Sequence, residues 1–198
     1  MAGVVALGAI LAGGHSSRMG QEKALILWRG QTLISRVIGA LREALGEVLI
    51  VGRDPGWGQA EGSPCIPDDE PDLGPLGGLR TALHHSGGRP VFLAGCDMPL
   101  LVPEAVRLVA SLLEDYDAAI PSIGGRLQPV HAIYSPACLT TADELLHTSR
   151  RSMHGMVKLI RVRIITEDEL RSVDSTLQSC WSVNTPDDLM RVDTDDRS

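Results

Sequence analysis

The residues best suited to chemistry lie in a glycine-rich loop near the N-terminus, which reads Leu11-Ala12-Gly13-Gly14-His15-Ser16-Ser17-Arg18-Met19-Gly20-Gln21-Glu22-Lys23. Two adjacent glycines let the backbone approach a ligand closely. Arg18 can bind a phosphate through two nitrogens, and Lys23 can add a point charge. The loop therefore predicts a phosphate-binding site, with a plain surface turn carrying solvated charges as the alternative.

Two widespread phosphate-binding motifs are absent from the chain. There is no GxGxxG, which disfavours a dinucleotide-binding fold, and no GxxxxGK[ST], because only two residues separate Gly20 from Lys23. The glycine-rich loop is therefore of another kind.

Two acidic residues follow predicted strands. Asp97 comes after the apolar run at 91–94, and Asp68 comes after a short run at 65–67. A carboxylate at the carboxyl end of a strand, beside a phosphate loop, suits Mg²⁺. Asp97 is too far from the next helix to cap it, so we predict a metal ligand there. Asp68 also fits a turn or a helix cap. If the acid after this strand has a role in the site, Asp69 is the second candidate.

The elements that must position these residues alternate along the chain. Hydrophobic patterns predict strands at 4–11, 47–51, 65–67, 90–94, 117–121, 130–134, 163–165 and 181–183, and helices at 32–45, 77–85, 103–113, 136–147, 152–160 and 186–192. This order predicts a Rossmann-like, three-layer α/β sandwich with a mostly parallel, mixed central sheet. Ligands bind such sheets outside the carboxyl ends of the strands. Residues 1–192 are expected to form one domain, and 193–198 a polar, disordered tail.

Composition narrows the class of protein. Hydrophobic residues make up 43% of the 198 residues and charged residues 22%, which is an ordinary globular profile. The net charge of -7 argues against nucleic-acid binding. The four cysteines form no CxxC pair, which disfavours zinc and fits reduced, mostly buried thiols in the cytosol. No apolar run is long enough for a membrane span or a signal peptide, so we expect a cytoplasmic protein.

A family resemblance adds to these observations. The pattern Leu-Ala-Gly-Gly-x-x-x-Arg-Met-Gly-x-x-Lys resembles the N-terminal loop of the nucleotidyltransferases of the molybdenum cofactor guanylyltransferase (MobA-like) family. Cytidylyl- and sugar-nucleotidyltransferases usually have Leu-Ala-Ala-Gly there, so Gly13 favours a guanine nucleotide. Two positions depart from the family pattern: Glu22 replaces a common Asp, and no Asn or Ser follows the second strand.

Four further segments extend the resemblance over nearly the whole chain: Asp68 with Gly74-Pro75-Leu76, Cys96-Asp97-Met98-Pro99, Arg126 to His131, and Val183 to Leu189. The resemblance implies that the nucleotide is bound by Leu11, Ala12, Gly13, Gly14, Arg18, Lys23, Asp68, Gly74, Pro75, Leu76 and Asp97. It implies Arg18, Lys23 and Asp97 as catalytic residues. It assigns Arg126, Gln128, His131 and Asn184 to the acceptor, and Asp97 and Asn184 to Mg²⁺. Arg150 and Arg151 are a further candidate for the acceptor phosphate, or else a solvated surface pair.

The resemblance also implies the fold of the nucleotide-diphospho-sugar transferases and an activity. That activity is the Mg²⁺-dependent transfer of GMP from GTP to molybdopterin, with or without molybdenum, giving a guanine dinucleotide cofactor and pyrophosphate. The implied partners are GTP, molybdopterin, and proteins of molybdenum insertion and molybdoenzyme maturation, but neither nucleic acid nor a membrane.

Three alternatives stay open. The first is a CTP-dependent molybdopterin cytidylyltransferase. The second is a sugar-phosphate nucleotidyltransferase, although the short C-terminal region leaves little room for a sugar-binding lobe. The third is a non-catalytic nucleotide sensor, against which Lys23, Asp97 and Asn184 are all present together.

Overall fold

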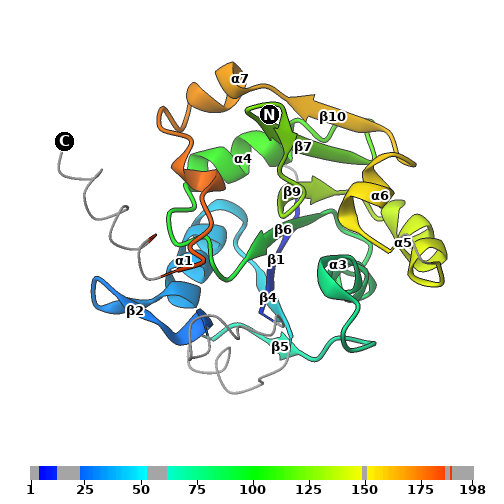
Figure 1. Cartoon of the computed structure of the whole chain (residues 1–198), viewed down its shortest axis with the longest axis horizontal. Helices are drawn as coiled ribbons and strands as arrows, with labels where there is room; N and C mark the ends of the chain where they lie inside the picture. The colour runs from blue at the N-terminus through cyan, green and yellow to red at the C-terminus, as the bar shows by residue number, and fades with distance from the viewer. Residues whose placement is uncertain (1–4, 13–22, 53–61, 149–150, 186–187, 189–198) are drawn as a thin grey trace.

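A mixed eight-stranded sheet forms the centre of this computed structural model, which describes residues 5–12, 23–52, 62–148, 151–185 and 188 (Figure 1). Its strands are β1 (Leu7–Leu11), β4 (Val48–Val51), β5 (Cys65–Ile66), β6 (Val91–Gly95), β7 (Ala118–Ile123), β8 (Arg126–Leu127), β9 (His131–Tyr134) and β10 (Val162–Ile165). The order is β10-β7-β9-β6-β1-β4-β5, with β8 paired to β7. Along this path only β9 runs antiparallel to its neighbours. The carboxyl ends of β1, β4, β5 and β6 therefore meet at one edge.

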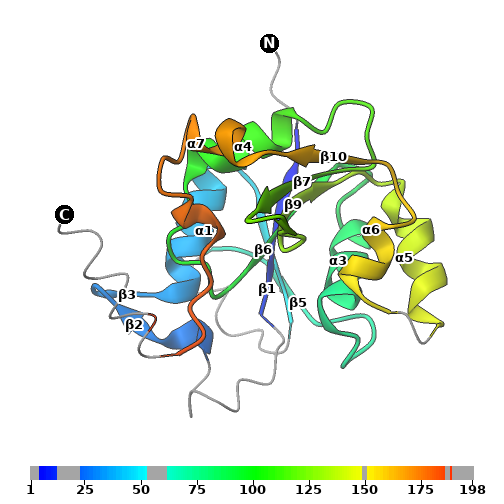
Figure 2. The same ribbon diagram turned by 45° about the horizontal axis from the view of Figure 1, so that its top comes forward.

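Helices cover both faces of the sheet, as Figure 2 shows. One face carries α1 (Leu33–Leu45), α4 (Pro103–Ser111), α7 (Glu167–Arg171) and the 3₁₀ turn η2 (Gln178–Cys180), and the other carries α3 (Gly74–His84), α5 (Cys138–Leu146) and α6 (Met153–Val157). Successive side chains of a strand point to opposite faces. In β1, for example, Ile10 packs on the α1 side and Ala9 on the α3 side. The predicted three-layer α/β sandwich is confirmed.

Helix α1 has the clearest local origin. Its apolar residues at Leu33, Val37 and Leu41 recur at helical spacing and are fully buried. Thr32 caps the first turn by accepting a hydrogen bond from Ser35 N at 3.2 Å. The helix ends at Gly46, whose φ of 86° suits glycine. The predicted end at Leu45 is confirmed, and the helix begins one residue later than predicted, with Thr32 as its N-cap.

A small hairpin precedes α1 and was not predicted. It pairs β2 (Leu27–Trp28) with β3 (Gln31–Thr32), and its turn residues Arg29 and Gly30 both have positive φ, as a type I′ turn requires. Trp28 is buried against Leu33 and Val183, which lie far apart in the sequence. The hairpin therefore supports the C-terminal segment that carries Asn184.

Several other elements differ from the sequence expectations. The helix expected at 77–85 begins at Gly74, because proline is tolerated in a first turn and Gly74 takes a φ of 65°. The strand expected at 181–183 is wrong: the amide of Val183 donates to Asp97 O at 2.8 Å, outside any strand ladder. Helix α7 was missed, although Thr166 and Glu169 form a capping box. The helix expected at 186–192 lies outside the described residues except for Asp188, as does the tail at 193–198.

The structure also describes the state of the cysteines and the lengths of the helices. All four cysteines are free thiols, as expected, but only Cys138 is fully buried, and Cys65, Cys96 and Cys180 are half-buried. Each helix in the described ranges is too short or too polar to cross a lipid bilayer.

Candidate active site

The carboxyl ends of four parallel strands lie side by side. Three backbone hydrogen bonds join neighbouring strands at or just beyond these ends: Cys96 N to Leu11 O (3.1 Å), Ala12 N to Val51 O (2.9 Å) and Gly52 N to Ile66 O (2.9 Å). This is the edge at which ligands bind open α/β sheets. Gly13, Gly14 and Arg18 lie outside the described residues. Of Lys23 the structure describes the backbone, which begins the 3₁₀ turn η1 (Lys23–Leu25).

One side of this edge is formed by Leu11, Asp68 and Gly78. A Cβ atom added to Gly78 would lie 2.5 Å from Leu11 Cδ2 and 3.7 Å from Asp68 Oδ1. Only glycine lets α3 approach the end of β1 this closely. Burial raises the pKa of Asp68, and the neighbouring acids Asp69 and Asp72 raise it further. The structure thus brings Leu11 and Asp68 together, as predicted from the sequence.

Asp69 occupies a different environment from Asp68. Its carboxylate lies 2.8 Å from His84 Nδ1 and 3.5 Å from Arg80 Nη1, and its backbone amide donates to Thr81 Oγ1 at 3.1 Å. All three partners belong to α3. Asp69 therefore anchors the loop to that helix, while the Asp68 carboxylate lies toward Leu11 and Gly78.

The first turn of α3 lies at the same edge. Gly74 and Pro75 are exposed, whereas Leu76 is 1% exposed and packs into the core. Leu73 stands at the N-cap and supplies no side-chain hydrogen bond to the turn. A helix start of this kind presents backbone amides and a positive dipole end to an anion.

Asp97 lies on the other side of the β1 end. Its carboxylate lies close to Gly95: a Cβ atom added to Gly95 would lie 2.3 Å from Asp97 Oδ1. Its carbonyl oxygen accepts the hydrogen bond from Val183 N at 2.8 Å. This bond sets Asn184, the next residue, beside the Asp97 loop, although 87 positions separate the two in the sequence.

Asp188 has a structural role close by. Its Oδ2 atom accepts hydrogen bonds from the amides of Asn184 and Thr185, both at 2.8 Å, and its own amide donates to Thr185 Oγ1 at 3.2 Å. These contacts are those of a helix N-terminus. They hold the backbone of Asn184 next to the residue whose amide donates to Asp97 O.

The donor atoms at Asp97 and Asn184 fit Mg²⁺. A carboxylate and a side-chain amide supply hard oxygen ligands, and Mg²⁺ in nucleotide enzymes is held by one or two such groups together with substrate phosphates. Among the described residues, no three His, Cys, Asp or Glu side chains gather as metal ligands.

The residues expected to contact the acceptor differ in their burial. Arg126 is exposed on β8, and Gln128 Nε2 donates to Arg126 O at 3.1 Å. The hairpin turn is held by Glu167 Oε1, which accepts from Gly124 N at 2.6 Å. Because β8 pairs with the carboxyl end of β7, both residues lie at the site edge. Their contact with an acceptor stays a prediction, as does that of Arg151, which is exposed; Arg150 lies outside the described residues.

His131 lies beneath that surface. It pairs with Ala94 across β9 and β6, is 1% exposed, and lies 2.9 Å through Nε2 from Ser179 Oγ of η2. Burial lowers the pKa of the imidazole to about 4, an effect that Asp174 only partly opposes. A direct contact of this ring with an acceptor, as expected from the sequence, would require the contact with η2 to open.

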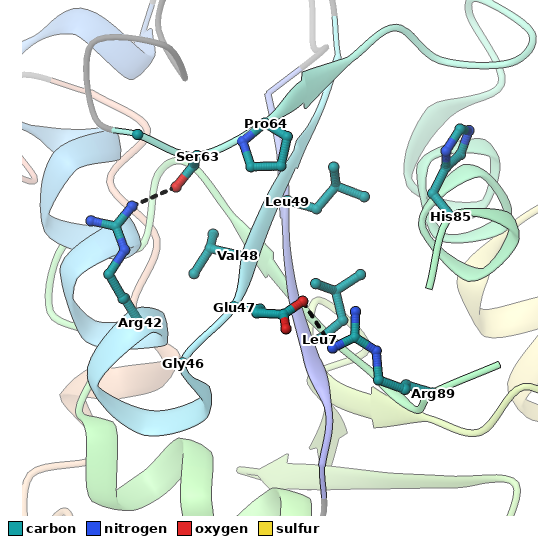
Figure 3. Close-up of a pocket in the computed structure, with 11 residues that line it drawn as sticks. Leu7, Arg42, Gly46, Glu47, Val48, Leu49, Ser63, Pro64, His85 and Arg89 are labelled. Atoms are coloured by element: carbon teal, nitrogen blue, oxygen red, sulfur yellow. Dashed lines mark hydrogen bonds and ion pairs between the residues drawn. The ribbon is translucent and has the colours of Figure 1, made fainter. Parts of the chain in front are cut away.

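A separate pocket of about 270 Å³ opens at the opposite edge of the sheet (Figure 3). It lies where β1 and β4 begin, near Leu7 and Val48. Its two arginines have partners: Arg42 donates to Ser63 Oγ at 2.8 Å, and Arg89 pairs with Glu47 at 2.9 Å. This pocket does not contain any of the chemical groups predicted above.

Sequence reasoning missed several residues that shape the site. Ser179 and Asp174 are buried beneath it, and Trp28 supports Val183 from the hairpin. Asp174 begins the polar run Asp-Ser-Thr, which is a turn signal. Nothing in the local pattern indicates that Ser179 meets His131, because that contact is purely tertiary.

Comparison with known proteins agrees with this geometry. The MobA-like NTP transferase domain matches residues 8–166, a range that includes Asp68 and Asp97 and ends before Asn184. A probable molybdenum cofactor guanylyltransferase of Pelotomaculum thermopropionicum is 38% identical, covering 94% of this chain and 91% of the relative. A molybdenum cofactor guanylyltransferase of Desulfosudis oleivorans is 32% identical, covering 94% and 93%.

Solved structures support the fold. Molybdopterin-guanine dinucleotide biosynthesis protein A from Archaeoglobus fulgidus superposes with a TM-score of 0.81 at 27% identity, covering 93% of this chain and 95% of that one. A 4-diphosphocytidyl-2C-methyl-D-erythritol synthase from Anaerococcus prevotii superposes with a TM-score of 0.72 at 10% identity over 98% and 96%, which shows a shared fold alone. The fold is that of the nucleotide-diphospho-sugar transferases, and the chain belongs to the MobA-like NTP transferases, a nucleotidyltransferase family, among the molybdenum cofactor guanylyltransferases.

Proposed function

We propose that this protein transfers GMP from GTP to the phosphate of molybdopterin and releases pyrophosphate. The observation that carries the proposal is the meeting, at one sheet edge, of the β1 end with Asp68 on one side and, on the other side, Asp97, whose carbonyl oxygen binds the amide of the residue before Asn184. The relatives named as molybdenum cofactor guanylyltransferases support the choice of GTP and of molybdopterin.

The reaction forms one bond and breaks another. An oxygen of the acceptor phosphate attacks the α-phosphorus of GTP, and the bond from the α-phosphorus to the bridging oxygen breaks, so that pyrophosphate leaves with both electrons of that bond. The attacking oxygen is already ionised, so no protein base is needed. The protein contributes in-line positioning and charge neutralisation, which dominate phosphoryl-group transfer of this kind.

We assign each of these roles to residues according to their positions in the chain. We assign the backbone of Leu11 to Gly14, with Asp68, to orientation of the nucleotide, and Arg18 and Lys23 to the negative charge of the departing pyrophosphate. Asp97 and Asn184 would hold Mg²⁺. When bound, this ion supplies positive charge to the phosphate oxygens of both substrates.

The acceptor enters from the β7 and β9 side of the edge in this proposal. Arg126 on β8 is exposed there and can neutralise the acceptor phosphate, and Gln128 braces the hairpin that carries it. We place the enzyme in the cytoplasm, and the four free thiols agree with a reducing compartment.

Calorimetric titration with GTP and with CTP, each with Mg²⁺, tests the nucleotide. We expect GTP to bind and CTP to bind more weakly; the reverse order would move the function to cytidylyl transfer. Release of pyrophosphate should require molybdopterin, and a hexose 1-phosphate in its place should give none. GTP binding without any turnover would favour a nucleotide sensor.

The substitution Asp97→Asn tests the metal role at nearly constant side-chain volume. We expect kcat to fall by about 10²–10³-fold, the usual cost of losing one preorganised charge partner. Asp117→Asn is a suitable control, since Asp117 is a half-buried carboxylate on the opposite edge that accepts from Arg161 N at 2.8 Å. Near-normal turnover of Asp97→Asn would refute the assignment.

A further inference from the structure

Three buried polar residues are linked by hydrogen bonds beneath the candidate site. His131, Asp174 and Ser179 are 1%, 4% and 0% exposed. Ser179 Oγ lies 2.9 Å from His131 Nε2 and accepts from Val102 N at 3.0 Å. The Asp174 carboxylate accepts from Ser179 N at 2.8 Å and from Gln178 N at 3.2 Å. These hydrogen bonds thus join η2 to β9 and to the loop that follows β6.

The Val102 amide hydrogen occupies one acceptor site of Ser179 Oγ. The hydroxyl hydrogen and a second acceptor site of the same oxygen remain for His131 Nε2, so either atom can be the donor of that bond. His131 Nδ1 has no hydrogen-bond partner among the described residues. Buried polar atoms normally have partners. The contact with Ser179 is the hydrogen bond that ties the ring to another side chain among the described contacts.

The three residue types are those of a hydrolytic triad, but the geometry is not. In a triad the carboxylate orients the imidazole and the serine hydroxyl is open to substrate. Here Asp174 accepts from the backbone amide of Ser179, and the Ser179 side chain is fully buried. The serine therefore cannot reach a substrate, and its role is exerted through the elements that it joins.

Those elements carry the two proposed metal ligands. Val102 ends the loop that begins at Asp97, and Asn184 follows Ser179 by five residues. Between them, the Val183 amide donates to Asp97 O. The segment 179–184 is thus held at Ser179, through its hydroxyl and its amide, at Val183, and at Asn184, whose amide donates to Asp188 Oδ2. Of these contacts, that of the Ser179 hydroxyl ties the segment both to β9 and to the loop that begins at Asp97.

We propose that Ser179, held between His131, Val102 and Asp174, is a positioning residue that sets Asn184 at the correct distance from Asp97. This inference rests on the proposed function, because it assumes that Asp97 and Asn184 share a metal ion. Groups that orient metal ligands typically change metal affinity by about 10–100-fold when they are removed.

The test compares Ser179→Ala with Ser86→Ala. Ser86 is an equally buried serine whose hydroxyl donates to Leu83 O at 2.9 Å after α3, far from the proposed metal ligands, so it controls for a lost buried hydroxyl. The first measurement is the affinity for Mn²⁺, a paramagnetic substitute for Mg²⁺, at saturating GTP. The second is GTP affinity without metal. The third is amide hydrogen exchange in residues 181–184.

We expect Ser179→Ala to weaken Mn²⁺ binding by about tenfold, to leave metal-free GTP affinity unchanged, and to speed exchange in 181–184 severalfold. Ser86→Ala should change none of these. His131→Gln, which offers the hydroxyl both a donor and an acceptor, should retain most of the Mn²⁺ affinity. Wild-type Mn²⁺ affinity and exchange in Ser179→Ala, or equal losses in Ser86→Ala, would overturn the proposal.

The exchange measurement separates this proposal from the proposed function. If the wild-type protein failed to bind Mn²⁺ with GTP, the proposed function would be wrong. Exchange in 181–184 would then decide by itself whether Ser179 fixes the segment, since that readout needs neither nucleotide nor metal.

Discussion

Burial of His131 predicts a specific dependence of stability on pH. The imidazole pKa lies at about 4 in the folded protein, against an ordinary value of 6.5. Between these values the unfolded chain binds a proton that the folded protein does not, so acidification favours unfolding. The stabilising contribution is complete above pH 6.5 and is lost progressively as the pH falls toward 4.

The magnitude follows from the two pKa values. A shift of this size amounts to about 3 kcal/mol in the limit of low pH, at about 1.4 kcal/mol per pKa unit. At pH 5 the unfolded ring is almost fully protonated and the folded ring mostly neutral, so about 2 kcal/mol of this is lost relative to pH 8.

Urea unfolding of the wild type and of His131→Gln at pH 8 and pH 5 measures this effect. The variant has no titrating group at this position, so its loss of unfolding free energy on acidification should be about 2 kcal/mol smaller than that of the wild type. The variant is less stable at pH 8, but only the difference between the two pH values enters the comparison. His154→Gln is a matched control, because it makes the same substitution at an exposed position on α6. Equal pH dependence in the wild type and His131→Gln would refute the claim that the ring is buried in its neutral form.

Three further predictions concern the site edge and helix α1. Asp68→Asn should raise the KM for GTP, whereas Asp69→Asn should mainly lower the melting temperature, because Asp69 is bound to α3; equal KM values would contradict this division. Gly95→Ala should fold normally but displace the Asp97 carboxylate, so Mn²⁺ affinity at saturating GTP should fall by about tenfold or more. Gly39 is at an exposed helical position, and no atom lies within 4 Å of a methyl group added there. Gly39→Ala should therefore raise the unfolding free energy by about 0.5–1 kcal/mol without changing kcat or KM. A lower melting temperature would show that the added methyl group does not fit at this position of α1.

Most strands and helices were predictable because their signals are local. Helix α1 carries its own cap, its own apolar stripe and its own terminating glycine, so its limits need no tertiary contact. Strand β1 is a short apolar run with residues buried on both faces, and the glycine-rich loop begins at its end. Placing Asp97 and Asp68 after parallel strands was enough to predict that both lie at one edge, because parallel strands end on the same side of a sheet.

Elements without a local signal were missed or misplaced. The residues Trp181 to Val183 alternate like a strand, yet the Val183 amide bonds a single carbonyl outside the sheet. The start of α3 was predicted three residues too late, at Gly77 in place of Gly74, because Gly74 and Pro75 are residues typical of turns. For Val183 the decisive partner, Asp97, is distant in the sequence.

The residue types and their spacing by themselves predict the chemistry of the site, since phosphate and Mg²⁺ bind particular donor atoms wherever these lie in the chain. Which of two adjacent acids lies toward β1 was decided by α3, whose Arg80 and His84 bind Asp69. Whether His131 lies in the site or under it was decided by Ser179, 48 residues away. The physical reason is that hydrogen bonds between distant segments form only when the packed sheet and helices bring them together, and no local pattern records that packing.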